Sequence, residues 1–241
     1  MITALTAQNT LEVTATESVS ESMFHSQLQA LSVDLPPAVI KTGMLGSAAI
    51  CRILADFLAT PKLAECPIVC DPILHSTSGT ELLDPAALDL LKNRIFPFVT
   101  VLTPNLPEAE QLLGKRMKVR DAAMRLLETG VQSVLIKGGH DEGGECRDYW
   151  TDGTQAMWLS SPRIESPATH GTGCILSSSI AAGIALGKTL PEAVIDAKTF
   201  LNQCLDAPAY LGRGRGPMQI EPFLNRSKDR PRVIPEAIGY R

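Results

Sequence analysis

Long apolar runs are missing from this sequence, since no uninterrupted stretch approaches the roughly 20 residues that a membrane-spanning helix requires. The first residues also lack a basic segment followed by an apolar core, so no signal peptide is expected. A net charge of −4 without a concentrated basic face argues against nucleic acid as a partner. The one dense basic stretch, residues 226–232, contains no aromatic side chain and is expected to be a solvated tail.

The spacing of zinc ligands is missing as well. The six cysteines stand at positions 51, 66, 70, 146, 174 and 204, and they form no CxxC pair or Cys/His cluster. A structural zinc site is therefore not expected. Several of these cysteines lie within apolar stretches, where a free thiol behaves as a small hydrophobic side chain. A reduced, cytoplasmic setting follows as the expectation.

Short β-branched runs are present, and they alternate with longer helical patterns. The expected strands are residues 2–7, 38–42, 67–74, 98–103 and 133–137. The expected helices are residues 18–31, 47–58, 85–93, 106–113 and 118–129. Several strand runs are apolar at successive positions, which is typical of parallel strands that are covered on both faces. With 44 % hydrophobic residues, the chain is expected to form one doubly wound α/β domain over residues 1–241, with its core at about 2–205.

The pattern changes after position 137. Residues 148–151 and 156–159 predict two strands that are joined at the Asp152-Gly153 turn, a strong indication of a β-hairpin. Two helices are expected next, over residues 173–186 and 191–205. The remaining residues, 206–241, are rich in Gly, Pro and Arg and are expected to be a loop-rich extension.

Five predicted strand-to-helix junctions carry polar or glycine-rich residues. They are residues 7–10, 42–45, 71–72, 103–105 and 137–140. Ligands of doubly wound folds bind beyond the carboxyl ends of the strands. These junctions are therefore expected to meet at one edge of the sheet and to line the site.

The strongest local motif is Thr-His-Gly-Thr-Gly-Cys at residues 169–174, directly before an apolar helix. Gly171 and Gly173 permit a tight turn, and with Thr172 they open the helix, whose free N–H groups and dipole form a cradle for phosphate. A helix N-terminus also favours the thiolate form of a cysteine. Cys174 could therefore accept a proton from a substrate hydroxyl that attacks a γ-phosphate. The alternatives are a glycine-rich helix start without function and a buried thiol.

Together these segments resemble the hydroxymethylpyrimidine/phosphomethylpyrimidine kinase family of thiamine biosynthesis, in the ribokinase-like superfamily. The resemblance extends over residues 2–205 and is carried by TALTAQNT at 3–10, KTGML at 41–45, DP and STSG within 71–79, TPNLPEAE at 103–110, KGGH at 137–140 and THGTGC at 169–174. It implies a doubly wound, mostly parallel sheet with helices on both faces. It also implies ATP and Mg²⁺ as cofactors and a small pyrimidine as the substrate.

On the nucleotide side, the resemblance gives Cys174 the role of catalytic base and residues 171–173 the role of an anion hole. It places Lys137 near the ATP phosphates as a catalytic lysine, with a solvent-exposed strand-end lysine as the alternative. Asn105 and Glu108 match an Asn-x-x-Glu element that organises Mg²⁺, with Glu108 on the metal side. The alternative for Glu108 is a carboxylate that only stabilises a helix start.

Three further roles follow from the resemblance. Gln8 and Met44 match residues that meet the pyrimidine, although Met44 alone would be interpreted as a core residue. Asp71 matches a carboxylate close to the phosphate-transfer site, with a turn residue before Pro72 as the alternative. Lys198 falls where the family places a lysine on the nucleotide side.

The sequence departs from the family pattern in two places. Family members normally begin with another βα unit that carries a Gly/Ser-rich stretch, whereas Met1 stands directly before the segment that follows this unit. We therefore expect the 241-residue chain to bind ATP but to phosphorylate its substrate slowly and to self-associate. The turn at residues 212–217 resembles a Gly-x-Gly-x-Gly-Pro element of the family, but the histidine that usually follows it is replaced by Gln219 nearby.

The implied activity is phosphoryl transfer from Mg-ATP to 4-amino-5-hydroxymethyl-2-methylpyrimidine and to its monophosphate. A pyridoxal kinase is the second interpretation, because the wider family shares the cradle and a heteroaromatic alcohol as substrate. A nucleotide-binding protein without catalysis is the third. The expected partners are the pyrimidine and ATP, with a homodimer left open, and neither nucleic acid nor a membrane is expected.

Overall fold

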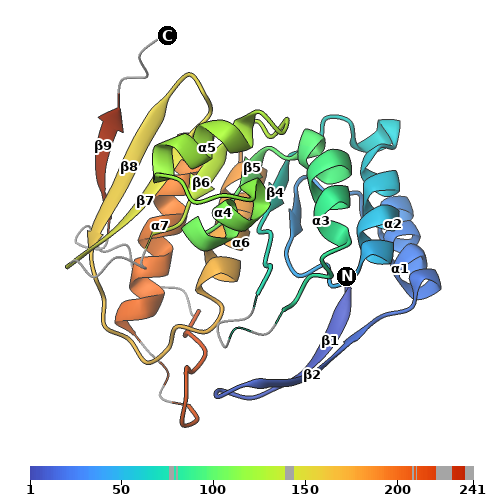
Figure 1. Ribbon diagram of the computed structural model, residues 1–241, viewed down its shortest axis with the longest axis horizontal. Helices are drawn as coiled ribbons and strands as arrows, with labels where there is room; N and C mark the ends of the chain where they lie inside the picture. Colours follow the sequence, from blue (N-terminus) through green and yellow to red (C-terminus); the bar gives the residue numbers. More distant parts are fainter. Residues whose placement is uncertain are drawn as a thin grey trace.

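A single central sheet carries most of the architecture of the computed structural model (Figure 1). The structure describes residues 1–75, 79, 81–138, 144–207, 209, 211–220 and 230–236. Within this part of the chain the strand order of the sheet is β3-β4-β5-β6-β7-β8-β9. The strands are β3 (Ile40–Thr42), β4 (Ile68–Cys70), β5 (Val101–Leu102), β6 (Val134–Ile136), β7 (Glu145–Thr151), β8 (Ala156–Pro162) and β9 (Arg232–Glu236).

The sheet is parallel in its first half and antiparallel in its second. Strands β3 to β6 pair in parallel, with Ile40 opposite Ile68 and Leu102 opposite Val134. From β6 to β9 each strand runs antiparallel to its neighbour. The predicted hairpin is confirmed as β7 and β8, and the left-handed backbone of Gly153 closes it at φ +86°. Asp152 supports this turn by accepting hydrogen bonds from the backbone N–H groups of Thr154 and Gln155.

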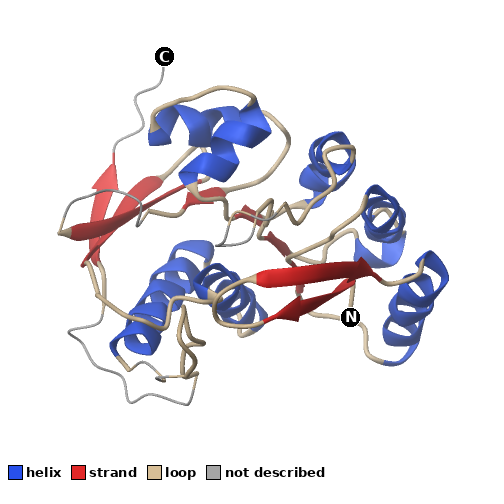
Figure 2. Cartoon of the chain, turned by 60° about the horizontal axis from the view of Figure 1, so that its bottom comes forward, coloured by secondary structure: helices blue, strands red, loops and turns tan. Residues whose placement is uncertain are grey.

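Helices cover both faces of the sheet, as predicted (Figure 2). One face is covered by α1 (Glu21–Asp34), α2 (Ala48–Leu58), α3 (Ala87–Leu90), α4 (Leu106–Leu113) and α5 (Val119–Leu127). The other is covered by α6 (Thr172–Ala185) and α7 (Leu190–Asp206). Successive residues of β4 point to opposite cores, since Ile68 packs in the first and Val69 in the second. This explains why the central strands are apolar at every position.

Short helical turns complete the chain between these elements. They are η1 (Pro61–Leu63), η2 (Leu91–Ile95) and η3 (Phe96–Phe98). The helix predicted at residues 85–93 is therefore shorter, because the backbone widens into the π-helical turn η2 directly after α3. None of the described helices is both long enough and apolar enough to cross a membrane.

Residues 2–7 contain a strand as expected, but its expected place in the central sheet is wrong. This segment does not join the central sheet, because β1 (Ala4–Gln8) pairs antiparallel with β2 (Val13–Ser18) in a separate two-stranded sheet. Most side chains of both strands are exposed, whereas a central strand would bury both of its faces. Asn9 makes the turn, where its side-chain oxygen accepts hydrogen bonds from the N–H groups of Leu11 and Glu12. Residues 7–10 are thus a hairpin tip rather than a strand-to-helix junction.

The predicted loop-rich extension also contains a strand. Strand β9 pairs with β8, with Ile234 opposite Trp158. Its Pro235 is tolerated because β9 lies at the edge of the sheet, where a missing N–H leaves no partner unpaired. The predicted solvated tail ends in this strand, where the guanidinium of Arg232 lies 3.4 Å from Glu145. Residues 226–229 of that tail lie outside the described part of the chain.

Candidate active site

Polar and charged residues of the site follow the ends of three neighbouring parallel strands. Asp71 follows β4, Asn105 follows β5 after two residues, and Lys137 follows β6. These strands are adjacent in the sheet, so their carboxyl ends meet at one edge. The residues predicted at this edge are therefore brought together. Gly139 and His140 of the fifth junction and residues 76–78 of the STSG motif lie outside the described residues.

Lys137 forms the centre of a buried charge cluster. Its Nζ donates to Asp71 Oδ1 at 2.8 Å and lies 3.7 Å from Glu108 Oε2. Asp71 is only 1 % exposed, and its carboxylate is paired with the Lys137 ammonium rather than solvated. Burial by itself acts to lower the pKa of Lys137, but the carboxylates of Asp71 and Glu108 outweigh it and raise the pKa above its usual value. The lysine is thus held in its charged form.

Asn105 and Glu108 satisfy each other at the start of α4. The N–H of Glu108 donates to Asn105 Oδ1 at 2.7 Å, and the N–H of Asn105 donates to Glu108 Oε2 at 2.8 Å. This capping box stabilises the start of α4, which is one of the two roles considered for Glu108. Glu108 is nevertheless only 8 % exposed, and its Oε2 lies 3.7 Å from the Lys137 ammonium, which a helix cap alone does not require.

The carboxylates of this site are too few to enclose a metal ion, but they suit one that is bound mainly by water and phosphate oxygens. No group of three or more His, Cys, Asp or Glu side chains that could hold a metal occurs within the described ranges. Mg²⁺ keeps several waters and is usually bound by one or two carboxylates together with phosphate oxygens of a substrate. Glu108 and Asp71, whose oxygens both approach Lys137, are hard ligands of the required kind.

The N-terminus of α6 points at the same charge cluster. Gly171 precedes the helix with φ +84°, a left-handed conformation that glycine adopts without strain. A Cβ atom on Gly173 would lie 3.1 Å from both Asp71 Oδ2 and Lys137 Nζ. The absence of a side chain at Gly173 thus lets the first turn of α6 approach the ion pair, with Thr172 beside it.

Cys174 is the third residue of α6, and it differs from the other thiols in exposure. Its side chain is exposed, whereas Cys51, Cys70 and Cys204 are buried. Burial raises the pKa of both Cys51 and Cys70 to about 12, so these two thiols stay protonated. Only Cys174 combines solvent access with a place in the helix turn that approaches Lys137 and Asp71.

The β1–β2 hairpin reaches the site from outside the central sheet. Gln8 Nε2 lies 3.3 Å from the Nε2 atom of His170, the residue before the glycine-rich turn. At the other end of the strand, Thr3 Oγ1 donates to the backbone carbonyl of Met44 at 2.6 Å. The Met44 side chain is half-buried. The hairpin therefore contacts the segment that contains Met44 and the residue that precedes the glycine-rich turn.

The glycine-containing turn at residues 212–217 contacts both the tip of the β1–β2 hairpin and the segment before α6. The N–H of Gly214 donates to Thr10 Oγ1 at 3.2 Å, and a Cβ on Gly214 would lie 2.1 Å from the carbonyl oxygen of Thr10. Two residues later, Gly216 accepts a hydrogen bond from the N–H of His170. The sequence analysis assigned no role to this turn, although glycines at alternate positions indicate a close approach of two backbones.

Lys198 lies apart from the Lys137 cluster. Its side chain in α7 forms an ion pair of 2.7 Å with Asp148 of β7 and lies 3.3 Å from Cys146 Sγ. Asp148 was missed in the sequence analysis. A carboxylate directly before the aromatic pair Tyr149 and Trp150 was the available indication.

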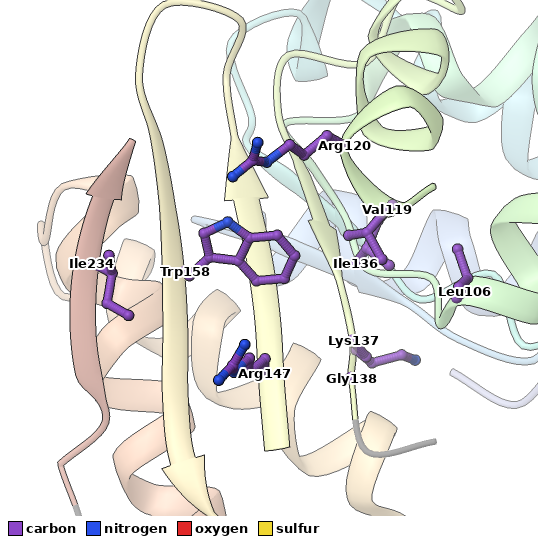
Figure 3. A pocket seen from close by; sticks show the side chains of 9 residues that line it. All are labelled: Leu106, Val119, Arg120, Ile136, Lys137, Gly138, Arg147, Trp158 and Ile234. Carbon is purple, nitrogen blue, oxygen red and sulfur yellow. The ribbon is translucent and has the colours of Figure 1, made fainter. Parts of the chain in front are cut away.

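A pocket of about 430 Å³ opens beside Lys137 on the side of the sheet that α4 and α5 cover (Figure 3). Its walls are mostly apolar, with Trp158 and Ile234 facing Leu106 and Val119. The cations that line it already have acidic partners. Arg120 Nε lies 2.8 Å from Glu236 and Arg147 donates to Glu145 at 2.7 Å. The pocket therefore provides an apolar surface next to the site rather than an additional charged centre.

A family model described as phosphomethylpyrimidine kinase matches residues 1–219 of the chain. The chain belongs to the phosphomethylpyrimidine kinase family. The match includes every residue that the sequence analysis placed in the site, from Gln8 to Lys198. The family assignment from the sequence is thereby confirmed, and so is its ribokinase-like fold.

Known relatives of this kinase family agree with the match. The chain is 40 % identical over 224 residues to the hydroxymethylpyrimidine/phosphomethylpyrimidine kinase of Synechococcus elongatus, covering 90 % of this chain and 83 % of that protein. It is 40 % identical over 222 residues to the thiamine biosynthesis bifunctional protein ThiED of Geobacter sulfurreducens. In that case the alignment covers 90 % of this chain but only 45 % of the longer protein.

The fold of this chain is also similar to that of a solved pyridoxal kinase. It is the pyridoxal kinase of Staphylococcus aureus in complex with AMP-PCP and pyridoxal, which superposes with a TM-score of 0.82 at 29 % identity. The superposition covers 98 % of this chain and 86 % of that one. Similarity in fold is therefore shared with a second vitamin kinase, whereas sequence identity is higher to the pyrimidine kinases.

Proposed function

We propose that this chain transfers the γ-phosphoryl group of Mg-ATP to 4-amino-5-hydroxymethyl-2-methylpyrimidine and to its monophosphate. The observation that carries the proposal is that the N-terminus of α6 meets the Lys137–Asp71 ion pair. A Cβ atom built on Gly173 in the first turn of α6 would lie 3.1 Å from both side chains of this pair. A cation and a row of free backbone N–H groups that face one point form a binding site for a phosphoryl group.

Each residue of the site has a distinct task in this mechanism. The ammonium of Lys137 binds phosphate oxygens, and Asp71 keeps it charged and oriented. The backbone N–H groups of residues 171–173 stabilise the negative charge that develops during transfer. Bound Mg²⁺, held by Glu108 together with water and phosphate oxygens, would neutralise part of this charge.

Cys174 acts as the general base in the first of the two reactions. It accepts the proton of the substrate hydroxymethyl group as the oxygen attacks phosphorus in line. In the second reaction the nucleophile is a phosphate oxygen, which carries no proton at neutral pH that must be removed. Gln8 and Met44 are proposed to meet the pyrimidine. Lys198 is proposed to lie on the nucleotide side, where its ammonium pairs with Asp148 rather than with ATP. The contacts of Gln8 with His170 and of Met44 with Thr3 are compatible with these places.

A pyridoxal kinase is the second candidate, and the similarity to the Staphylococcus aureus enzyme over 98 % of the chain supports it. Both substrates are heteroaromatic alcohols, so the phosphoryl-transfer residues serve either reaction. The identity of 40 % to a pyrimidine kinase, against 29 % to the pyridoxal kinase, favours the pyrimidine.

The test is a coupled assay of ADP release with hydroxymethylpyrimidine, its monophosphate and pyridoxal at equal concentrations. We expect the highest kcat/KM for the two pyrimidines. A higher value for pyridoxal would replace the proposed substrate. Binding of AMP-PCP without turnover of any of the three would support a nucleotide-binding protein that does not catalyse.

We further propose that the chain acts as one domain in the cytoplasm and forms a homodimer. All six cysteines are free thiols, which supports a reducing compartment. The hairpin exposes Leu5 of β1 at 57 % and Leu11 of its turn at 53 %, and exposed apolar side chains on one hairpin favour association. Light scattering coupled to size-exclusion chromatography tests the dimer, and a monomer at 50 μM would contradict it.

A further inference from the structure

Asp148 joins three elements of the nucleotide-side half of the molecule. Its Oδ1 accepts a hydrogen bond of 2.7 Å from the backbone N–H of Gly138, directly after Lys137. Its Oδ2 lies 2.7 Å from the ammonium of Lys198. One carboxylate in β7 therefore connects the end of β6 with the middle of α7.

The ion pair between Asp148 and Lys198 is buried, and its two charges neutralise each other. Asp148 is 2 % exposed and Lys198 is 3 % exposed. Burial alone acts to lower the pKa of Lys198, but Asp148, with the nearby Cys146, outweighs it and raises the pKa above the usual value. Each charge thus needs the other, since a single buried charge without its partner is strongly unfavourable.

The position of Gly138 explains why such a connection matters. A Cβ atom at Gly138 would lie 2.0 Å from the carbonyl oxygen of Arg147, so the end of β6 is pressed against β7. Ile136, two residues earlier, is the last residue of β6 that is paired with β7. Beyond that point the chain continues to Lys137, and the hydrogen bond to Asp148 fixes the next peptide.

We propose that Asp148 is a positioning residue for Lys137, and that Lys198 acts as the buried counter-ion of Asp148. Asp148 holds the Gly138 peptide and so sets the direction in which the Lys137 side chain leaves the sheet. The proposal rests on the proposed function, in which the Lys137 ammonium binds phosphate oxygens. A displacement of a reacting group by 1 Å can cost about 100-fold in rate, so fixing one peptide next to Lys137 is a sufficient reason for a buried ion pair.

The test is a mutant cycle between Asp148/Lys198 and Lys137. Asp148→Leu with Lys198→Met replaces the ion pair by apolar side chains of similar size, and Lys137→Ala removes the positioned group. The affinity for AMP-PCP is measured by calorimetry for both variants and for the combined triple variant. We expect the double variant to weaken AMP-PCP by about 10–100-fold, the range for groups that orient a binding residue. We expect it to weaken AMP-PCP by less than about threefold when Lys137 is already absent.

Two further variants make the result specific. Asp148→Asn with Lys198→Met keeps an oxygen acceptor for the Gly138 N–H without a buried charge, and we expect it to recover most of the lost affinity. The matched control is Asp196→Leu with Lys188→Met, which removes an exposed ion pair of 2.6 Å between α7 and the turn that precedes it. It should leave the affinity and the melting temperature unchanged.

Several outcomes would overturn the proposal. Equal losses in the presence and absence of Lys137, or no recovery in the Asn/Met variant, would indicate that Lys198 or Asp148 contacts the nucleotide directly. If the Leu/Met variant does not fold, the Asn/Met variant carries the cycle with Lys137→Ala. Failure of the unmodified chain to bind AMP-PCP would overturn both proposals, whereas intact AMP-PCP binding without turnover would overturn only the proposed function.

Discussion

Lys137 and Asp71 lie 66 residues apart in the sequence, yet their side chains form an ion pair of 2.8 Å. The contact exists because β4 and β6 are parallel strands with only β5 between them, so both end at the same edge of the sheet. It keeps a charged lysine in a site that is largely removed from water. The same edge receives the N-terminus of α6, which makes this ion pair the centre of the site.

Removal of the Asp71 charge should change the pH dependence of catalysis. The pKa of Lys137 is raised above its usual value because its carboxylate partners outweigh burial. In Asp71→Asn the main partner is lost and burial lowers the pKa, so the charged form disappears at a lower pH. We expect kcat/KM for ATP to fall at least 10-fold at pH 8, and its alkaline limb to move to lower pH. A pH–rate profile from 6.5 to 10.5 measures both, and an unmoved alkaline limb would show that Lys137 does not titrate in the assay.

Cys174 should matter for the first phosphorylation far more than for the second. Cys174→Ala is expected to lower turnover of hydroxymethylpyrimidine by about 10²–10⁴-fold, the usual contribution of a general base. The monophosphate needs no proton transfer, so its turnover should fall by less than about 10-fold. Stability should change little, because the side chain is exposed. Full activity of the alanine variant with the alcohol would remove Cys174 from the mechanism.

Exposure also predicts which thiol reacts first. At pH 8 iodoacetamide should alkylate Cys174 ahead of Cys51 and Cys70, whose pKa values burial raises to about 12. AMP-PCP with Mg²⁺ should slow this reaction, because the phosphates would lie beside the first turn of α6. Peptide mass spectrometry after timed quenching identifies the site. Equal alkylation with and without AMP-PCP would place the nucleotide elsewhere.

The roles of Glu108 as a helix cap and as a metal ligand can be tested separately. Glu108→Gln keeps the shape of the capping box but removes its charge, and we expect the Mg²⁺ concentration for half-maximal rate to rise about 10-fold, which corresponds to 1.4 kcal/mol. The matched control is Glu192→Gln, in the capping box that Thr189 and Glu192 form at the start of α7. Both variants should lose similar stability. If both also leave the Mg²⁺ requirement unchanged, Glu108 is a helix cap only.

The sequence predicts the central strands well because they are buried on both faces. The apolar runs at 68–70 and 133–137 contain β4 and β6, and the Asp152-Gly153 turn gives the β7–β8 hairpin. Strands β1, β2 and β9 were misplaced or missed for a common reason. All three are largely exposed, so their pairing depends on the partner strand and the turn rather than on a buried apolar pattern.

The site was predictable where one local motif carries the chemistry and unpredictable where two distant segments share it. The glycine-rich start of α6 is visible as a motif, as is the Asn105–Glu108 box. Asp148 and Lys198 are 50 residues apart, and nothing near either of them indicates the other. Thr10 and Gly214 are 204 residues apart, and nothing in the sequence near either residue indicates their contact.

That last contact leads to a prediction about substrate binding. Gly214→Ala would place a methyl group 2.1 Å from the carbonyl oxygen of Thr10, so the tip of the β1–β2 hairpin must move away from the glycine turn. Gln8, two residues before Thr10, would then lose its place beside His170. We expect KM for hydroxymethylpyrimidine to rise at least 10-fold, with little change in KM for ATP, because the Lys137 cluster does not touch the hairpin tip. Gly144→Ala is the control, since a Cβ there meets no atom of the described residues within 4 Å. Steady-state kinetics with each substrate varied in turn give both constants, and an equal rise in the two KM values would mean that the hairpin tip does not act on the pyrimidine side alone.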